Sequence, residues 1–159
     1  LHCDQYLPVD ADMIPTGKKA NVKGTPWDFT TPHTIGERIN DEQLGKKNAT
    51  GRGYDHCYIV RPNSADKTTG LTLTAHVSDP KSGRVMEVFT NQPGIQLYSG
   101  NFLSGEEKDG EHAQNTAFCL ECQVYPDTPN QEKDGFPTSR INPGEVYKHV
   151  TVHRFSAQK

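Results

Sequence analysis

The chain has 159 residues, a formal net charge of -3 and 32% hydrophobic residues. This charge offers nothing to attract nucleic acid or an anionic membrane surface, and no run approaches the ~18 consecutive apolar residues that span a bilayer. We therefore expect one soluble domain over residues 1–159 with no nucleic-acid and no membrane partner. We expect it to be cytoplasmic, with secretion left open.

One segment is predicted to be helical. Across residues 34–44 the apolar Ile35, Ile39 and Leu44 lie loosely along one side, and Gly45 follows at a position typical of a helix end. The whole chain is polar and rich in turn residues, with 14 glycines and 11 prolines. This composition favours many short strands over long amphipathic helices.

Strand-like runs follow in order, either alternating apolar with polar residues or rich in β-branched and aromatic ones. They cover residues 54–60, 71–77, 85–90, 95–98, 117–124 and 149–153. Turn-forming clusters separate them, and one of these, Ser82-Gly83-Arg84, suits a hairpin connection or a ligand contact equally well. Short strands at this density predict an all-β antiparallel sandwich.

The four cysteines, Cys3, Cys57, Cys119 and Cys122, are too few to indicate a disulfide scaffold, so we interpret them as free thiols. On a strand, Cys119 and Cys122 point to opposite faces and cannot easily hold one metal ion. We therefore expect no metal site. The triplet Asn48-Ala49-Thr50 fits N-glycosylation, but such triplets arise readily by chance.

Glu121 stands out because a carboxylate inside an otherwise apolar strand is costly unless something needs it. In the run from Phe118 to Val124, Cys119, Glu121 and Gln123 share one face and the apolar residues share the other. On base rates alone, the first face would be on solvent. A functional interpretation places Glu121 in a binding cleft.

Asp55 and His56 lie where the glycine-containing segment 51–53 leads into a strand, a common place for binding groups. The structural alternatives are a turn cap for Asp55 and a partly buried, hydrogen-bonded ring for His56. For His56 we prefer the structural alternative. The aromatic residues that could stack on a sugar, most of which we expect in the core, are Trp27, Tyr54, Phe89 and Tyr98.

Several ordered motifs, spread nearly from end to end, resemble the C-terminal half of the aldose 1-epimerases, the galactose mutarotases. They are Tyr6-Leu7-Pro8-Val9-Asp10, Gly24-Thr25-Pro26-Trp27-Asp28-Phe29, Gly53-Tyr54-Asp55-His56, Ser82-Gly83-Arg84-Val85-Met86-Glu87-Val88-Phe89-Thr90, Gln92-Pro93-Gly94-Ile95-Gln96-Leu97-Tyr98-Ser99-Gly100-Asn101-Phe102, Phe118-Cys119-Leu120-Glu121-Cys122-Gln123 and Pro143-Gly144-Glu145-Val146-Tyr147. Such a set, in order and at consistent spacing, is far more specific than any one motif.

The resemblance implies a large antiparallel β-sandwich of the galactose mutarotase type, of which this chain is the C-terminal half. It also implies interconversion of the α and β anomers of free aldoses such as galactose and glucose, without a cofactor. By motif position Glu121 is the base, while Asp55 and Gln96 bind the sugar. Cys122 stands where the family commonly has threonine, facing away from Glu121.

The family's two active-site histidines lie in its N-terminal half, and none of the seven histidines of this chain sits in a matching motif. We therefore expect a second polypeptide or segment that carries that half. Two alternatives stay open. One is a non-catalytic carbohydrate-binding or structural module with the same fold, and the other is an epimerase acting on a phosphorylated sugar.

Overall fold

A computed structural model describes residues 1–44, 53–62, 65–104 and 112–158. Its strands are β1 (Gln5–Tyr6), β2 (Ala20–Asn21), β3 (Asp55–Ile59), β4 (Thr72–Ser78), β5 (Arg84–Thr90), β6 (Gly94–Tyr98), β7 (Cys119–Gln123) and β8 (Thr151–Ala157). Its helical turns are η1 (Ile35–Glu37), η2 (Glu42–Leu44), α1 (Thr128–Gln131) and η3 (Glu132–Asp134). The glycosylation triplet at 48–50 lies outside the described residues.

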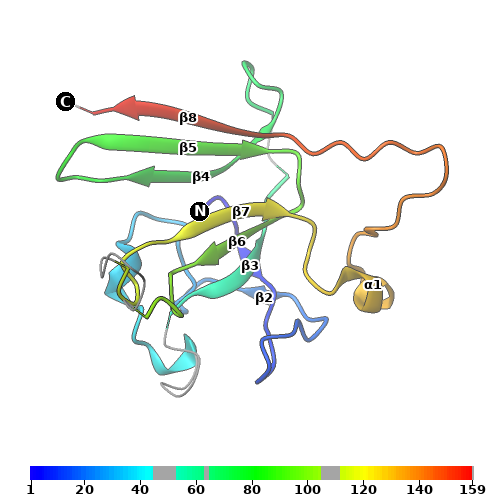
Figure 1. The fold of residues 1–159 in the computed structure, drawn as a ribbon, viewed down its shortest axis with the longest axis horizontal. Helices are drawn as coiled ribbons and strands as arrows, with labels where there is room; N and C mark the ends of the chain where they lie inside the picture. The colour runs from blue at the N-terminus through cyan, green and yellow to red at the C-terminus, as the bar shows by residue number, and fades with distance from the viewer. Residues whose placement is uncertain (45–52, 63–64, 105–111, 159) are drawn as a thin grey trace.

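The strands form two antiparallel sheets, a five-stranded sheet in the order β2-β1-β3-β6-β7 and a three-stranded sheet in the order β4-β5-β8 (Figure 1). Ser82 and Gly83 lie in the turn between β4 and β5, which pair antiparallel, and Arg84 begins β5, so the hairpin interpretation of this segment is confirmed. The six predicted strand runs correspond to β3 to β8, with ends that differ by at most four residues.

One hydrophobic core joins the two sheets. Ala75 and Val88 from the three-stranded sheet belong to the same buried cluster as Tyr58, Ile95 and Leu97 from the five-stranded sheet. Burying apolar faces of two sheets against each other is the main source of stability in a β-sandwich. The prediction of an all-β antiparallel sandwich is thus confirmed.

The helix predicted over residues 34–44 is wrong as a continuous element. The chain forms two separate 3-10 turns, Ile35–Glu37 and Glu42–Leu44. Leu44 is buried, and Ile35 and Ile39 pack against the core. The spacing of these apolar residues therefore reflects their contact with the core and does not indicate a helix. The short helix α1 was missed because Pro129 and Asn130 are poor helix formers.

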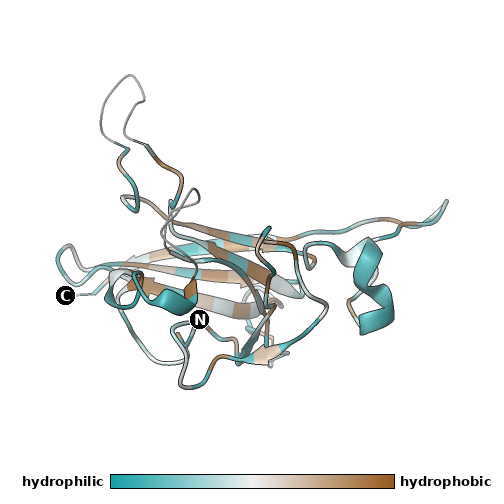
Figure 2. Cartoon of the chain, turned by 90° about the horizontal axis from the view of Figure 1, so that it is seen from below, coloured by the Kyte–Doolittle hydropathy of each residue, from teal (hydrophilic) through white to brown (hydrophobic). Residues whose placement is uncertain are grey.

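An extended arm, residues 137–150, connects η3 to β8 and projects beyond the sheets (Figure 1). Figure 2 shows brown, hydrophobic residues concentrated on the strands and teal, hydrophilic residues on α1. In the described part of the chain, no helix is both long and apolar enough to cross a membrane.

Candidate functional site

The three predicted site residues lie on one face of the five-stranded sheet. Gln96 of β6 is directly opposite Cys57 of β3 on one side and Glu121 of β7 on the other. Paired residues project to the same face, and so do residues two positions apart on one strand. Asp55, Gln96 and Glu121 therefore share the face turned away from the core between the two sheets.

Asp55 and Gln96 are joined directly. The side-chain Nε2 of Gln96 donates a hydrogen bond of 2.7 Å to Oδ1 of Asp55. Both side chains are half-buried. The Oε1 atom of Gln96 is buried and accepts no hydrogen bond from any described residue. A buried acceptor without a donor costs free energy. A ligand that donates a hydrogen bond to this oxygen would remove that cost.

A buried polar cluster fixes the start of β3, where Asp55 lies. The backbone N–H of Tyr54 donates to Ser99 Oγ at 2.8 Å, and Asn101 Nδ2 donates to the carbonyl of Tyr54 at 3.0 Å. Asn115 closes the cluster by donating to Asn101 Oδ1 and to the carbonyl of Ser99. These bonds hold the residue before Asp55 against the end of β6.

Gly53 is required by the same cluster. A side chain at this position would run into the Asn101 carboxamide and the Ser99 hydroxyl. The backbone there has φ of 147°, a conformation that other residues rarely adopt. The glycine of the Gly-Tyr-Asp-His motif therefore allows the backbone to pack closely against this polar cluster. The cluster in turn fixes the position of Asp55.

Glu121 is exposed on the same face. Its exposure matches the interpretation that this face of the strand meets solvent, and the register places it opposite Gln96, which bonds Asp55. Leu120 and Cys122 project to the opposite face and pack against the core. The predicted division of β7 into two faces is confirmed, including the placement of Cys122 away from Glu121.

Two groups of aromatic residues lie on either side of Asp55, Gln96 and Glu121. On one side Tyr125 and Phe136 pack with Leu7 over Cys57. On the other, Tyr98 lies opposite Asp55 and Cys119 in the register, and its ring stacks on Phe102 with centroids 6.1 Å apart. The hollow that Asp55 and Gln96 line has a volume of about 80 Å³. That is well below the roughly 300 Å³ of typical small-molecule sites, so the hollow formed by the described residues is too small to enclose such a ligand.

The pair Tyr98 and Phe102 was only partly anticipated from the sequence. Trp27, Tyr54 and Phe89 are buried in the core as expected, whereas Tyr98 is half-buried and Phe102 is 55% exposed. The signal that could have found Tyr98 is its spacing of two from Gln96, which puts both on one face of a strand.

His56 is buried on the core face, where its ring meets Tyr6 and Trp27 edge-on at 6.0 and 5.1 Å between centroids. Its Nδ1 accepts a hydrogen bond from the backbone N–H of Asp55. Burial lowers the pKa of His56 to about 4, so the ring is neutral at physiological pH. The structural interpretation of His56 is confirmed. No turn-capping bond from Asp55 occurs among the described residues.

The four cysteines are all free. Burial raises the pKa of Cys3 and of Cys57 to about 12, which keeps both thiols protonated and unreactive. In the described ranges, no group of three or more His, Cys, Asp or Glu side chains could hold a metal ion.

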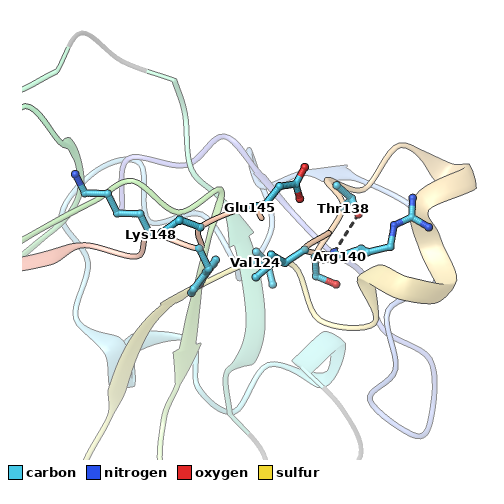
Figure 3. Close-up of a pocket in the computed structure, with 9 residues that line it drawn as sticks. Val124, Thr138, Arg140, Glu145 and Lys148 are labelled. Atoms are coloured by element: carbon cyan, nitrogen blue, oxygen red, sulfur yellow. Dashed lines mark hydrogen bonds between the residues drawn. The ribbon is translucent and has the colours of Figure 1, made fainter. Parts of the chain in front are cut away.

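Larger hollows lie elsewhere among the described residues. One of about 490 Å³ lies between the first residues, the segment 29–35 and strands β4, β6 and β7. Another, of about 570 Å³, is lined by Val124 and the arm, and Figure 3 shows its charged groups, Arg140, Glu145 and Lys148, pointing apart from one another. Neither hollow includes a predicted site residue.

Comparisons with known proteins agree on one family. Residues 1–154 match the family model described as Aldose 1-epimerase. The chain is 40% identical to human galactose mutarotase over 159 residues and 33% identical to the aldose 1-epimerase of Escherichia coli. These alignments cover 98% of this chain but 42% and 43% of those proteins. The chain thus spans about two fifths of the length of the curated relatives it matches.

Solved structures give the same result. The GalM/aldose epimerase homologue from C. elegans superposes with a TM-score of 0.78 at 26% identity, covering 100% of this chain and 45% of that one. A galactose 1-epimerase from Lactobacillus acidophilus has the same fold, with a TM-score of 0.77 at 24% identity and 43% of its length covered.

Proposed function

The chain belongs to the aldose 1-epimerase family, and from that membership we propose that it is the C-terminal part of a galactose mutarotase. Its substrates are free aldoses such as galactose and glucose, whose α and β anomers it interconverts without a cofactor. The observation that carries the proposal is that Asp55, Gln96 and Glu121, on the adjacent strands β3, β6 and β7, project from the same face of the sheet.

In the proposed reaction the Glu121 carboxylate takes the proton from the C1 hydroxyl, and an acid donates a proton to the ring oxygen. The bond between C1 and the ring oxygen breaks as the C1 carbonyl forms. Rotation of the aldehyde end and closure on the other face, with both proton transfers reversed, give the second anomer. Acid and base must both lie within hydrogen-bond reach of the sugar, which demands fixed placement.

The placement of Glu121 at a strand centre supports this role. Gln96 lies opposite it in the register, so the sheet backbone fixes the spacing between the carboxylate and the binding pair. Asp55 offers two acceptor oxygens, and its bond to Gln96 leaves one of them for sugar hydroxyls. The exposed position of Glu121 leaves room for a sugar ring above it.

The proton donor belongs to the part of the family fold that this chain does not span. We propose that a second polypeptide or segment carries it, because the curated relatives are more than twice as long as the match. The small hollow at Asp55 supports this division, since a second part is needed to enclose a sugar.

Polarimetry on freshly dissolved α-galactose and α-glucose tests the function. The native protein should accelerate the approach to the equilibrium rotation, and its intact mass should identify any added polypeptide or segment. An unchanged rate with a protein that contains both parts contradicts the enzyme and favours the non-catalytic carbohydrate-binding module. Isothermal titration with galactose then measures whether binding alone survives.

A further inference from the structure

We propose that Met13 is a further sugar-binding residue, whose side chain packs against the C–H groups of the sugar that Asp55 holds. The identity of the ligand rests on the proposed function, whereas the placement of Met13 follows from the structure. Three features of the molecule support the contact: the lining of the hollow at Asp55, the backbone conformation of Met13, and the hydrogen bonds that hold its turn.

The hollow at Asp55 has a polar side and an apolar side. Asp55 and Gln96 form the polar side, and the buried Oε1 atom of Gln96 accepts no hydrogen bond from any described residue. The apolar side is formed by Leu7, Val9, Met13, Pro15, Cys57 and Pro126. This division suits a sugar, whose hydroxyl groups lie beside the C–H bonds of its ring carbons.

Met13 lies at the rim of this hollow. The apolar residues at the closed end are buried, whereas Val9, Met13 and Pro126 are half-buried. A half-buried side chain still has apolar surface that a bound ligand can cover. Of these three residues, methionine has the longest side chain, and its unbranched thioether adapts to the shape of what it contacts.

The backbone of Met13 is held in a conformation that methionine avoids. Its φ is 64°, in the left-handed region. In the part of the chain that the structure describes, Asn115 and Asp127 are the other residues with a positive φ that are not glycine. Asparagine and aspartate adopt this conformation with the help of a short polar side chain, which methionine lacks. Strained residues persist only where the surrounding structure holds them, and they cluster at functional sites.

All three of these residues border the candidate site. Asn115 belongs to the polar cluster at the start of β3, where its side chain donates to Asn101 and to the carbonyl of Ser99. Asp127 follows Pro126, which lines the hollow, and Met13 lines the hollow directly. The strained backbone at Met13 is therefore part of the site and not of a remote loop.

Hydrogen bonds within the turn hold Met13 in place. Oδ1 of Asp10 accepts bonds from the backbone N–H groups of Asp12 and Ile14, at 2.9 and 3.0 Å. The N–H of Asp10 donates to the carbonyl of Ile14. The N–H of Met13 donates to the carbonyl of Asp10. These bonds use the backbone of Met13 and leave its side chain to line the hollow.

Truncation of the Met13 side chain tests the contact in the native protein, with any second polypeptide or segment retained. Met13→Ala should raise the KM of galactose mutarotation, and the Kd of galactose measured by isothermal titration, about five- to tenfold. The kcat should change by less than about twofold, because a contact away from C1 is equally strong in the ground state and the transition state. Met13→Leu, which keeps an apolar side chain of similar size, should stay within about twofold of the parent in both constants.

Ile14→Ala is the matched control. Ile14 has a side chain of similar size in the same turn, is 48% exposed, and is not among the residues that line the hollow. Its backbone bonds to Asp10 remain after the change. KM and Kd should therefore change by less than about twofold.

Met13→Gly separates the contact from the backbone strain. Glycine adopts a φ of 64° readily, whereas alanine keeps the Cβ atom that disfavours it. The urea midpoint of the Gly variant should therefore lie above that of the Ala variant. Both variants lack the thioether, so both should raise KM and Kd by the same factor.

An unchanged Kd in Met13→Ala overturns the proposal, as does an equal rise in Ile14→Ala. An affinity that follows the urea midpoint, weaker in the Ala variant than in the Gly variant, would give Met13 a structural role and also overturn it. The parent protein separates this claim from the proposed function. Galactose binding without mutarotation contradicts the enzyme alone, and mutarotation with an unchanged Kd in Met13→Ala contradicts the contact alone. A parent protein that neither binds nor converts galactose contradicts both.

Discussion

At the scale of single residues, Glu121 is the group on which the proposed chemistry depends. We expect Glu121→Gln to lower the mutarotation rate of the two-part protein by about 10²- to 10⁴-fold, because the amide cannot take the C1 hydroxyl proton. Galactose affinity, measured by isothermal titration, should change little. Glu132→Gln, at a site in η3 that is also exposed, serves as the control. A variant at position 121 that keeps its full rate removes this carboxylate from the mechanism.

His56 makes the stability of the fold depend on pH. Its pKa is about 4 in the folded chain against 6.5 for an ordinary histidine, because burial disfavours the charged ring. The unfolded chain therefore binds the proton more tightly than the folded chain does. Above pH 6.5 the neutral ring of His56 costs the fold no stability, and the fold loses stability as the pH falls from 6.5 toward 4. The loss is on the order of 3 kcal/mol of unfolding free energy.

Urea unfolding between pH 7 and pH 4 measures this effect. His56→Gln keeps an acceptor for the Asp55 N–H and should show a shallower decline over that range. An equal decline in the variant and the parent chain would assign the acid sensitivity to other groups, of which His2, whose pKa burial also lowers, is the first to test.

At the scale of elements, the polar cluster between β3 and β6 decides where Asp55 lies. Asn101→Ala removes hydrogen bonds to Tyr54, Ser99 and Asn115 in a buried place, so we expect a loss of about 2 kcal/mol in unfolding free energy. Sugar affinity should fall as well, since Asp55 loses its anchor. Asn21→Ala, at an exposed position in β2, should cost less than about 0.5 kcal/mol. Lost stability with unchanged affinity would show that the cluster does not position Asp55.

Periodicity predicted the elements where packing agrees with local pattern. The period of two in β7 correctly separated Glu121 from Leu120 and Cys122, because a strand has only two faces. The same reasoning failed at residues 34–44, where apolar spacing reflects contact with the core and the backbone forms two short turns. No pattern could show that Gln96 bonds Asp55, since strand register depends on contacts distant in sequence.

At the scale of the molecule, the two sheets share one core and should unfold together. Val88 of β5 is fully buried in the same cluster as Trp27, the single tryptophan of the chain. Trp27 stacks on Tyr6 of β1, which belongs to the five-stranded sheet. Val88→Ala should lower the free energy of unfolding by on the order of 2 kcal/mol, through lost burial and the cavity left behind. Because the core is common, Trp27 fluorescence and far-ultraviolet circular dichroism should report the same shifted urea midpoint. Ser156→Ala, exposed on β8, should leave both midpoints in place. A shift seen by circular dichroism but not by Trp27 would mean that the three-stranded sheet unfolds independently.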